Sequence, residues 1–349
     1  FGLISFLSMF VLASLIIWPL EAEEPPPGEK FIRVAVLKDV NEVRLALRGR
    51  YEVTDGKSGK EFYQGRKNFE SRAVARKGGI FFDGEEFPTD HLRIKTNKDI
   101  SIWIKGKEKR YRQLIDIRKE KNGKLLVVNT VDLETYIKGI LYHETSRRWP
   151  MEAFKAQAVA SRTYALYRMQ SSMALPYDVT SDIYSQVYGG KSAERYRTNI
   201  AVDKTKGEVM LFEGEVLPAY FSSSCGGHTE NVSELWKQNI PALVGRSCPY
   251  CKGMPHWTWK RNFRSKDVEA KLSAAGIKTG QIIDIRVAGR NKSGRVTTLE
   301  FTSKEGRVVE IFGKKFRDII GPNIVRSNKF DVVMKGYYFD LIGQGWGHG

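Results

Sequence analysis

The stretch from residue 125 to residue 169 most constrains the fold, because it joins an apolar strand to two helices. Residues 125–129 form the kind of apolar run that is typical of a buried strand. Asp132 can cap the helix that follows, whose apolar positions have helical spacing. Pro150 can open a second helix, 151–169, in which small residues permit close packing. A strand that leads into buried helices indicates an α+β fold.

Short strands dominate the chain before this stretch. Alternating or continuous apolar residues predict strands at 31–37, 43–47, 80–82, 100–104 and 114–117. Glycine- and lysine-rich turns separate these strands, and no residues among them suggest chemistry. We therefore interpret 31–118 as a β-rich supporting module and 119–349 as a catalytic domain of helices packed on antiparallel strands.

Strand signals return in the second half of the chain. Glu213-Gly214 predicts a tight turn between strands at 209–212 and 216–221. A short helix is expected at 267–275, ending at Gly276. Three further strands are expected, at 282–287, 296–301 and 308–311.

The charge of the chain limits its partners. The 349 residues carry a formal net charge of +17, which favours association with nucleic acid, an anionic membrane or an anionic cell-wall polymer. The basic residues are scattered, and no base-reading motif accompanies them. We therefore do not expect nucleic acid as a partner.

The first residues indicate export. Residues 1–20 are apolar apart from serines, and an acidic, proline-rich linker follows at 23–30. We expect 1–22 to be a signal peptide cleaved after Ala22, or else a membrane anchor. Either places the protein in the cell wall, in the periplasm or anchored outside the cytoplasm. The chain starts without Met and stops within a glycine-rich sequence, so we expect both ends to be truncated.

Glu144 is the candidate for acid–base chemistry. It lies between the two expected helices, where Tyr142 and Trp149 can shield it from water and offer a platform for a sugar ring. Shielding raises the pKa of a carboxylic acid, so that it can donate a proton near neutral pH. The alternative is an ion pair with Arg147 or Arg148, both at helical spacing.

Several ordered motifs resemble the stage II sporulation protein D family, whose domain also occurs in amidase enhancers. They are LETYIKGI (133–140), Glu144, Trp149-Pro150, AFKAQAVASRTYA (153–165), SQVYGG (185–190), YFSSSCGG (220–227) and GWGHG (345–349). The resemblance implies lytic transglycosylase activity on peptidoglycan glycan strands, with the family's catalytic acid at Glu144. That family usually has Met and Pro after the glutamate, where this chain has Thr145 and Ser146.

One carboxylate is enough for the implied chemistry, because the same residue can give and then take a proton. A hydrolase would need a second carboxylate, for which Asp182 and Glu230 are candidates. Other polar and aromatic residues are expected to bind the sugar by their position in the chain, although buried structural roles remain open for some of them. The expected substrate-binding set is Tyr142, Trp149, Gln157, Arg162, Ser185, Gln186, Tyr188 and His348.

The three cysteines of the chain suggest a metal site. Cys225 and His228 form one C-x-x-[CH] pair, and Cys248 and Cys251 form another, which suits a structural, four-ligand zinc ion. His256 competes with His228 for the fourth position. A Cys248–Cys251 redox pair, or a disulfide from Cys225 to either one, is the alternative in an exported protein. With only three ligands, a metal-dependent hydrolase such as an amidase would become the rival.

A rival function from another class follows from the same resemblance. The chain would then be a non-catalytic protein that binds the wall and activates an N-acetylmuramoyl-L-alanine amidase, its partner. The surroundings of Glu144 favour the enzyme.

Overall fold

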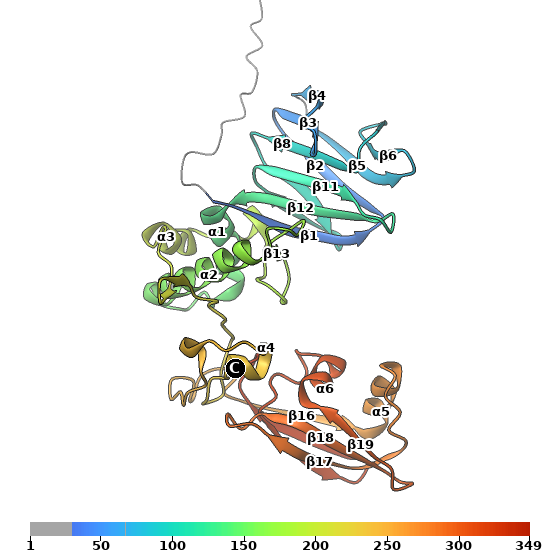
Figure 1. Ribbon diagram of the computed structural model, residues 1–349, viewed down its shortest axis with the longest axis vertical. Coiled ribbons are helices and arrows are strands. Elements are labelled where there is room, and N and C mark those ends of the chain that lie inside the picture. Colours follow the sequence, from blue (N-terminus) through green and yellow to red (C-terminus); the bar gives the residue numbers. More distant parts are fainter. Residues whose placement is uncertain (1–29, 67) are drawn as a thin grey trace, which may run out of the picture. The chain divides into compact units, whose positions relative to one another are not determined.

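The computed structural model describes residues 30–66 and 68–349. They form two compact units that divide after Glu208: the described residues up to Glu208 (unit 1) and Val209–Gly349 (unit 2), shown in Figure 1. Helices accompany mainly antiparallel sheets in both, which confirms the α+β class. The expected signal or anchor at 1–22 and all of the linker but Lys30 lie outside the described residues. None of the described helices is long and apolar enough to cross a membrane.

Unit 1 begins with consecutive strands that divide between two sheets. One sheet has the order β13-β1-β12-β11-β8-β3-β4, and the other has the order β10-β9-β2-β5-β6-β7. Neighbours pair antiparallel, except that β1 and β13 (Val179–Thr180) are parallel. The other strands are β1 (Phe31–Val40), β2 (Glu42–Leu47), β3 (Tyr51–Asp55), β4 (Glu61–Gly65), β5 (Phe69–Arg76), β6 (Gly79–Phe82), β7 (Glu85–Phe87), β8 (His91–Thr96), β9 (Ile100–Ile104), β10 (Lys107–Tyr111), β11 (Leu114–Lys119) and β12 (Leu125–Asp132).

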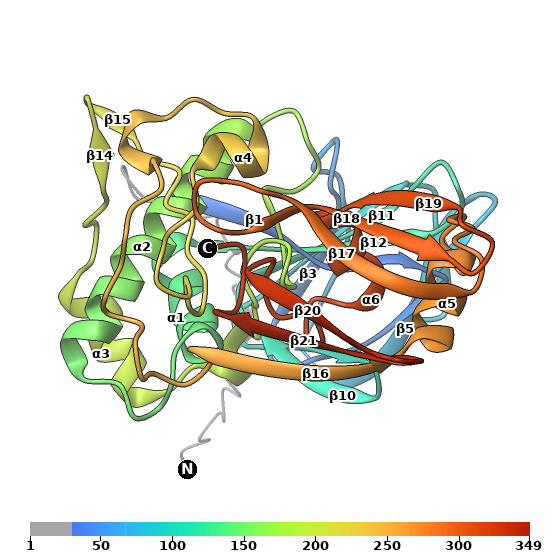
Figure 2. The ribbon, with the colours of Figure 1, turned by 90° about the horizontal axis from the view of Figure 1, so that it is seen from below.

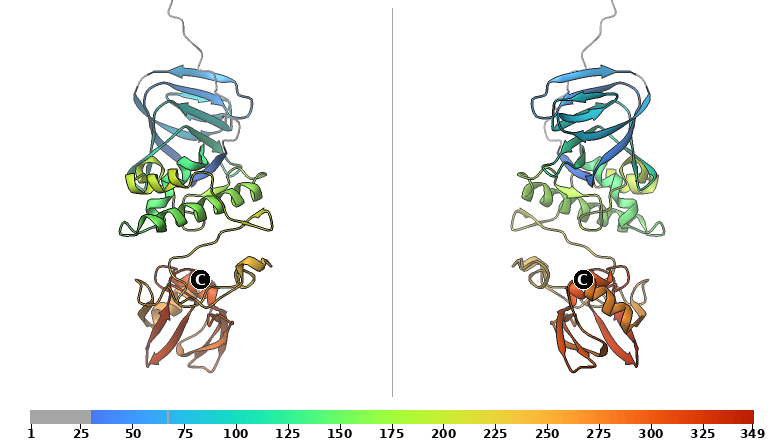
Figure 3. Two further views of the ribbon diagram at one scale, coloured as in Figure 1. Left: turned by 90° about the vertical axis from the view of Figure 1, so that its left-hand side faces the viewer. Right: turned by 90° about the vertical axis from the view of Figure 1, so that its right-hand side faces the viewer.

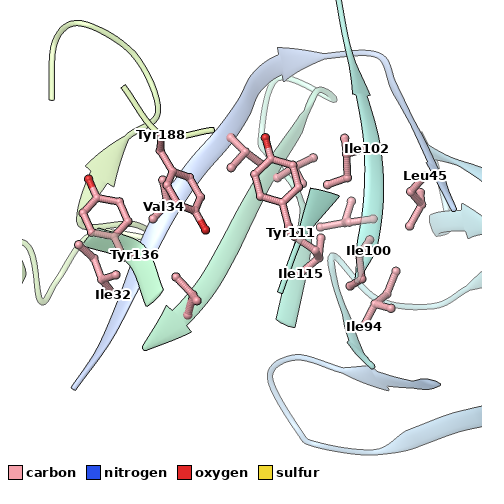
Figure 4. Close-up of a cluster of buried hydrophobic side chains, with 14 of the residues drawn as sticks. Ile32, Val34, Leu45, Ile94, Ile100, Ile102, Tyr111, Ile115, Tyr136 and Tyr188 are labelled. Carbon is pink, nitrogen blue, oxygen red and sulfur yellow. The ribbon is translucent and has the colours of Figure 1, made fainter. Parts of the chain in front are cut away.

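The inward side chains of the two sheets form one apolar core (Figure 4). Val34 and Ile115 come from the first sheet, and Leu45 and Ile102 come from the second; all four are buried. Full burial of such a side chain contributes about 1.5–3 kcal/mol. The same cluster extends to Tyr136 on the first helix. The sheets and the helices therefore share a core.

This shared core changes the domain boundary that the sequence predicted. The predicted boundary at 118/119 falls within β11, just before its last residue, Lys119. β11 pairs with β12 from Leu114 opposite Thr130 to Lys119 opposite Leu125. The structure instead divides after Glu208. The β-rich module thus continues directly into the helical part, because a hydrogen-bonded sheet joins them.

Three helices lie at one end of these sheets (Figure 3). They are α1 (Leu133–Glu144), α2 (Met151–Ser171) and α3 (Tyr196–Lys204), with a 3-10 turn, η1 (Gly190–Ala193), before α3. The Asp132 side chain accepts a hydrogen bond from the Thr135 amide at 2.9 Å, which confirms the predicted cap of α1. α2 begins at Met151, so that Pro150 is its N-cap and not its first residue.

The buried guanidinium of Arg162 joins the three helices of unit 1. It forms two hydrogen bonds with the Glu134 carboxylate of α1, at 2.8 and 2.7 Å. It also donates to the carbonyls of Val202 in α3 and of Glu208. Arg162 was expected to bind sugar, but these contacts use its donors inside the protein and match the structural alternative.

Unit 2 contains two three-stranded sheets, with orders β16-β21-β20 and β17-β18-β19. Figure 2 shows β17 next to β20, and Arg290 of β17 donates to the Phe330 carbonyl of β20 at 2.9 Å. The elements are β14 (Leu211–Phe212), β15 (Glu215–Val216), α4 (Val232–Trp236), η2 (Pro241–Leu243), β16 (Thr258–Arg264), α5 (Ser265–Ala274), β17 (Ile282–Arg290), β18 (Val296–Ser303), β19 (Val308–Phe312), α6 (Gly313–Ile320), β20 (Phe330–Lys335) and β21 (Tyr338–Gln344).

Unit 2 has its own apolar core, in which Phe301 and Phe316 pack with Phe339. The predicted hairpin around Glu213-Gly214 is present but much shorter than expected, since its strands have two residues each. The helix at 267–275 and the three strands after it are present within two or three residues of the predicted bounds. β16, β20, β21 and α6 were not predicted.

We expect Arg162→Ala to lower the free energy of unfolding of the chain by about 3 kcal/mol, because it leaves the Glu134 carboxylate without its partner. Urea titration measures the change. Lys138→Ala is the matched control: Lys138 pairs with Asp203 between α1 and α3 in a more exposed setting, so we expect a loss below about 1 kcal/mol. Unchanged stability with weakened glycan binding would return Arg162 to the substrate-binding residues.

Candidate active site

Glu144 is the last residue of α1, at the point where the chain leaves the helix for the turn before α2. Thr145 follows in extended conformation, and its hydroxyl donates to the Leu141 carbonyl at 2.6 Å, which closes the end of the helix. The negative end of the helix dipole faces this position. A carboxyl group there is therefore easier to protonate than one on an open surface.

One oxygen of Glu144 is held and the other is available. The Val187 amide donates to Oε1 at 2.8 Å. Burial raises the pKa of Glu144, and the Val187 hydrogen bond opposes this shift only in part. In the described part of the chain, no basic side chain forms an ion pair with Glu144. The predicted alternative, pairing with Arg147 or Arg148, is therefore not what the structure contains.

Buried side chains place the loop that carries Val187. The Tyr188 hydroxyl donates to Asn129 Oδ1 of β12 at 2.7 Å, and the Gly189 amide donates to the Gly139 carbonyl of α1 at 3.0 Å. Gln186 accepts from the Tyr136 hydroxyl at 3.0 Å. Gln186 and Tyr188 were expected to bind sugar, but both are buried. They position the loop and do not line an open surface.

The other expected sugar-binding residues of unit 1 are more accessible. Trp149 is 39% exposed, and Tyr142 is half-buried beneath the Arg195 guanidinium, 4.5 Å from the ring centre. The Gln157 amide donates to the Ser161 hydroxyl at 3.2 Å. The Ser185 hydroxyl accepts from the Thr180 amide at 3.1 Å. Trp149 and Tyr142 therefore remain the best placed to meet a ligand.

Sequence reasoning missed two exposed side chains on the same loop. Ile183 and Tyr184 are 62% and 83% exposed, four and three residues before Val187. Large side chains this exposed on an ordered loop are candidates for ligand contact. The sequence offered a signal for these two residues, since an apolar residue and an aromatic residue directly precede the family motif that begins at Ser185.

The two candidates for a second carboxylate are occupied elsewhere. Asp182 accepts from the Thr180 hydroxyl at 2.8 Å and from the Tyr184 amide at 3.0 Å, which orders its loop. Glu230 belongs to unit 2, where it is buried with Arg295, 3.6 Å away, and accepts from Ser293. These hydrogen bonds give both acids a structural role.

The three cysteines lie together in unit 2. The sulfur atoms of Cys225, Cys248 and Cys251 lie within 4.8 Å of one another, and those of Cys225 and Cys251 are 3.4 Å apart. All three thiols are free. Thiolates around one ion with metal–sulfur bonds of about 2.3 Å lie roughly 3.8 Å apart. This group could therefore bind a metal ion.

The histidines lie outside this group. His228 donates through Nδ1 to the Thr229 carbonyl at 2.6 Å, and His256 accepts through Nδ1 from Arg326 at 3.3 Å. Among the described residues, the gathered ligand atoms come from the three cysteines alone. His228, the expected fourth ligand, is therefore not placed with them.

Two glycine-containing loops meet beside Cys225. Ser224 and Trp346 exchange both backbone hydrogen bonds, at 3.0 and 2.9 Å. A Cβ on Gly226 would lie 2.8 Å from the Gln344 carbonyl, and one on Gly345 would lie 2.7 Å from the Ser224 carbonyl. Both glycines also have positive φ. Side chains at either position would separate the loops.

His348 fixes the second of these loops. Its Nε2 donates to the Phe221 carbonyl at 2.9 Å, and its ring meets Trp236 edge-on. Burial lowers the pKa of His348, which keeps the ring neutral. His348 belongs to unit 2 and matches the loop-fixing alternative that the sequence left open.

The comparisons with known proteins agree with these motifs. Residues 121–212 match a family described as Stage II sporulation protein, and residues 232–349 match a domain of unknown function (DUF8618). An uncharacterised protein of Brachyspira hyodysenteriae is 34% identical over 229 residues, which are 65% of this chain and 61% of that protein.

Two named relatives are more distant. The Stage II sporulation protein D of Bacillus amyloliquefaciens is 29% identical over 239 residues, 64% of this chain and 66% of that protein. The Amidase enhancer of Bacillus subtilis is 27% identical over 259 residues, 61% of this chain and 36% of that protein. The chain thus matches between about one third and two thirds of the length of these relatives.

The raised pKa of Glu144 predicts a pH-dependent effect of Glu144→Gln on stability. The folded pKa lies above the unfolded one, so the carboxyl's favourable contribution is complete below the unfolded value and is lost as pH rises through the folded value. Glutamine keeps the acceptor for Val187 but cannot ionise. We therefore expect equal melting temperatures at about pH 4 and a higher one for the variant at about pH 8.

The exposed Glu152 provides the control, because Glu152→Gln makes the same chemical change without burial. Its melting temperature relative to wild type should change little between the two pH values. A Glu144→Gln variant that is less stable at the higher pH would mean that a cation stabilises the Glu144 carboxylate.

Proposed function

Because the chain belongs to the stage II sporulation protein D family, with a role related to the cell wall, we propose that it is a lytic transglycosylase of peptidoglycan. The observation that carries the proposal is Glu144: a half-buried carboxyl with a raised pKa, oriented through Oε1 by the Val187 amide. Oε2 forms no hydrogen bond with the described residues, in contrast to Oε1. It is the oxygen that can exchange a proton with substrate.

The reaction needs this one residue. Protonated Glu144 donates its proton to the oxygen that links N-acetylmuramic acid to N-acetylglucosamine, and the bond between that oxygen and the muramic C1 breaks. An oxocarbenium-like state develops at C1. The muramic 6-hydroxyl attacks C1 while Glu144, now a carboxylate, takes the hydroxyl proton. The products are a 1,6-anhydromuramic end and a free 4-hydroxyl, and no water is consumed.

The surroundings favour this reaction over hydrolysis. Hydrolysis by two carboxylates needs a second acid across the sugar from the first. Asp182 and Glu230, the two candidates, are engaged in structural hydrogen bonds. An internal nucleophile avoids the need for a base that activates water. Trp149 and Tyr142 offer apolar faces on which a sugar ring can stack.

The net charge of +17 supports the substrate and a location outside the cytoplasm. Glycan strands carry the carboxylates of muramic acid, and a basic protein binds such polyanions. Export, by a cleaved signal or with an anchor, fits a substrate that lies beyond the membrane.

The name Amidase enhancer, carried by a 27% identical relative, favours a second candidate function. In that case the chain binds the wall and activates an amidase without cutting glycan. The two functions make opposite demands on Glu144: the enzyme requires its proton, whereas a binding protein does not.

We expect the chain to release anhydromuramic ends from peptide-stripped glycan strands, and Glu144→Gln to reduce this rate by about 10²-fold or more. Mass spectrometry of the products measures both. Glu152→Gln controls for the loss of a carboxylate near the start of α2 and should cleave normally. Reducing ends in place of anhydro ends would indicate a hydrolase. Binding without cleavage by any of the proteins would favour the amidase-activating role.

We also propose that the three cysteines hold a structural zinc ion. Arg295 donates a hydrogen bond to the Cys225 carbonyl, and Lys329 donates one to the Gly226 carbonyl. These two cations hold the loop that carries the first ligand in place. Three thiolates bring more negative charge than Zn²⁺ carries, which leaves the ion little Lewis acidity. The ion would therefore cross-link Cys225 to the 248–251 loop and take no part in cleavage.

We expect the purified chain to contain one zinc ion, and Cys248→Ser to lower both the metal content and the melting temperature. Elemental analysis and thermal unfolding with and without a chelator measure these effects. Ser247→Ala, at the neighbouring position, should retain the metal. A chain that retains full stability without metal, or that contains a disulfide between two of the cysteines, would contradict the proposal.

A further inference from the structure

We propose that a groove on unit 2 binds an acidic glycan, namely the muramic-acid-containing strand of peptidoglycan. The inference rests on the proposed function for the choice of ligand, but on unit 2 alone for the site. Residues 232–349, which contain the groove, match a domain to which no function is assigned.

Two adjoining hollows form the groove. The larger has a volume of about 530 Å³, and the smaller of about 350 Å³. Both are lined by Lys266 and Glu269 of α5, so the two hollows adjoin. Ligand pockets typically have volumes of about 300–1,000 Å³. Two adjoining hollows suit an extended chain better than a compact small molecule.

The fold builds the larger hollow where three segments meet. β16 ends at Arg264 and passes directly into α5, while the turn between β20 and β21 brings Tyr337 alongside. Arg264 pairs with Tyr338 in the sheet, and the Ser265 amide donates to the Tyr337 carbonyl at 2.9 Å. The lining is thus fixed by backbone hydrogen bonds and not by loose side chains.

A buried hydroxyl without a partner points to a ligand. Ser265 lines the larger hollow and is only 3% exposed, yet its Oγ has no hydrogen-bond partner among the described residues. Leaving a buried hydroxyl unsatisfied costs about 1–3 kcal/mol. A hydroxylated ligand in the hollow would supply the missing hydrogen bond.

Two neighbouring tyrosines give the groove an aromatic surface. Tyr337 and Tyr338 are 69% and 46% exposed, although both are large and amphipathic. Aromatic faces pack against the apolar faces of sugar rings, while polar side chains bind the hydroxyl groups at the edge. Gln281, an exposed residue that also lines the larger hollow, can bind hydroxyl or acetamido groups. These residue types fit a saccharide.

The charge of the groove selects an acidic saccharide. Arg264, Lys266 and Lys278 line it, and none of the three side chains forms an ion pair or hydrogen bond with the described residues. The one acidic residue of the lining, Glu269, accepts from the Ile282 amide at 2.7 Å. Three unpaired cations therefore face the groove. The lactyl carboxylates of muramic acid recur along a glycan strand and can pair with them.

A second glycan-binding site would increase the rate of cleavage because it keeps the glycan strand bound to the protein. A strand held in the groove has a raised effective concentration at any other site of the same chain. This predicts that the groove matters for long strands and not for short oligosaccharides.

The test measures binding of peptide-stripped glycan strands by calorimetry, using the full chain with Glu144→Gln so that cleavage does not interfere. We expect Tyr337→Ala/Tyr338→Ala and Arg264→Ala/Lys266→Ala each to weaken binding by about tenfold or more. Ser265→Ala should weaken it without lowering the melting temperature, because its hydroxyl has no partner in the protein. Phe312→Ala, an exposed aromatic outside the groove, and Lys292→Ala/Lys315→Ala, which remove the same charge, are the matched controls.

The ligand is varied to test the role of charge. Strands whose carboxylates are reduced to alcohols should bind more weakly and should be insensitive to Arg264→Ala/Lys266→Ala. The proposal is overturned if the groove variants bind strands as the controls do, or if they lose affinity equally for double-stranded DNA and polyphosphate, which would indicate a general anionic surface.

Cleavage separates this inference from the proposed function. With Glu144 intact, the groove variants should cleave a muramic-acid tetrasaccharide at the wild-type rate and long strands more slowly. If no protein cleaves any substrate while groove binding behaves as expected, the transglycosylase proposal fails and the groove stands. If cleavage of long strands is unaffected by every groove variant, the groove proposal fails and the transglycosylase stands.

Discussion

The candidate active site depends on one buried amide, Asn129, in an otherwise apolar strand. Its Nδ2 donates to the carbonyls of Arg112 and Leu114, which ties it into the sheet, and its Oδ1 accepts from the Tyr188 hydroxyl. An amide buried in this way must use its donors and acceptors within the protein. Tyr188 then fixes the loop whose Val187 amide orients Glu144. The β-sheet therefore determines, through two side chains, where a helix-end carboxylate points.

This arrangement explains why Glu144 can be both oriented and reactive. A carboxylate bound by several donors or paired with a cation would have a lowered pKa and would give up its proton too readily. A single amide hydrogen bond orients the group and leaves burial as the dominant influence on its pKa. Arg162, the buried cation of α2, is neutralised by Glu134.

The sequence predicted the helical part of the site well, because its signals are local. The Asp132 cap, the apolar spacing in α1 and the proline before α2 each act within one or two turns. The roles of Arg162, Gln186 and Tyr188 were not predictable, since a polar residue beside a motif looks the same whether it faces solvent or a core. In β20 burial alternates along the strand, but Val333 is an apolar residue at an exposed position, which weakens the alternating pattern in the sequence. The groove had no local signal, because Arg264 and Tyr338 meet only through the pairing of β16 with β21.

The contact between the two glycine-containing loops has a consequence for how unit 2 can vary. Cys225 lies between Ser224, which is paired with Trp346, and Gly226, which lies against Gln344. A metal ion held at Cys225 would thus be thermodynamically linked to the docking of the 345–349 segment. Metal binding at Cys225 would then stabilise the docked conformation of the 345–349 segment, and docking would in turn raise the affinity for the metal. The two segments are far apart in the chain but pack against each other, so a substitution in one must remain compatible with the other.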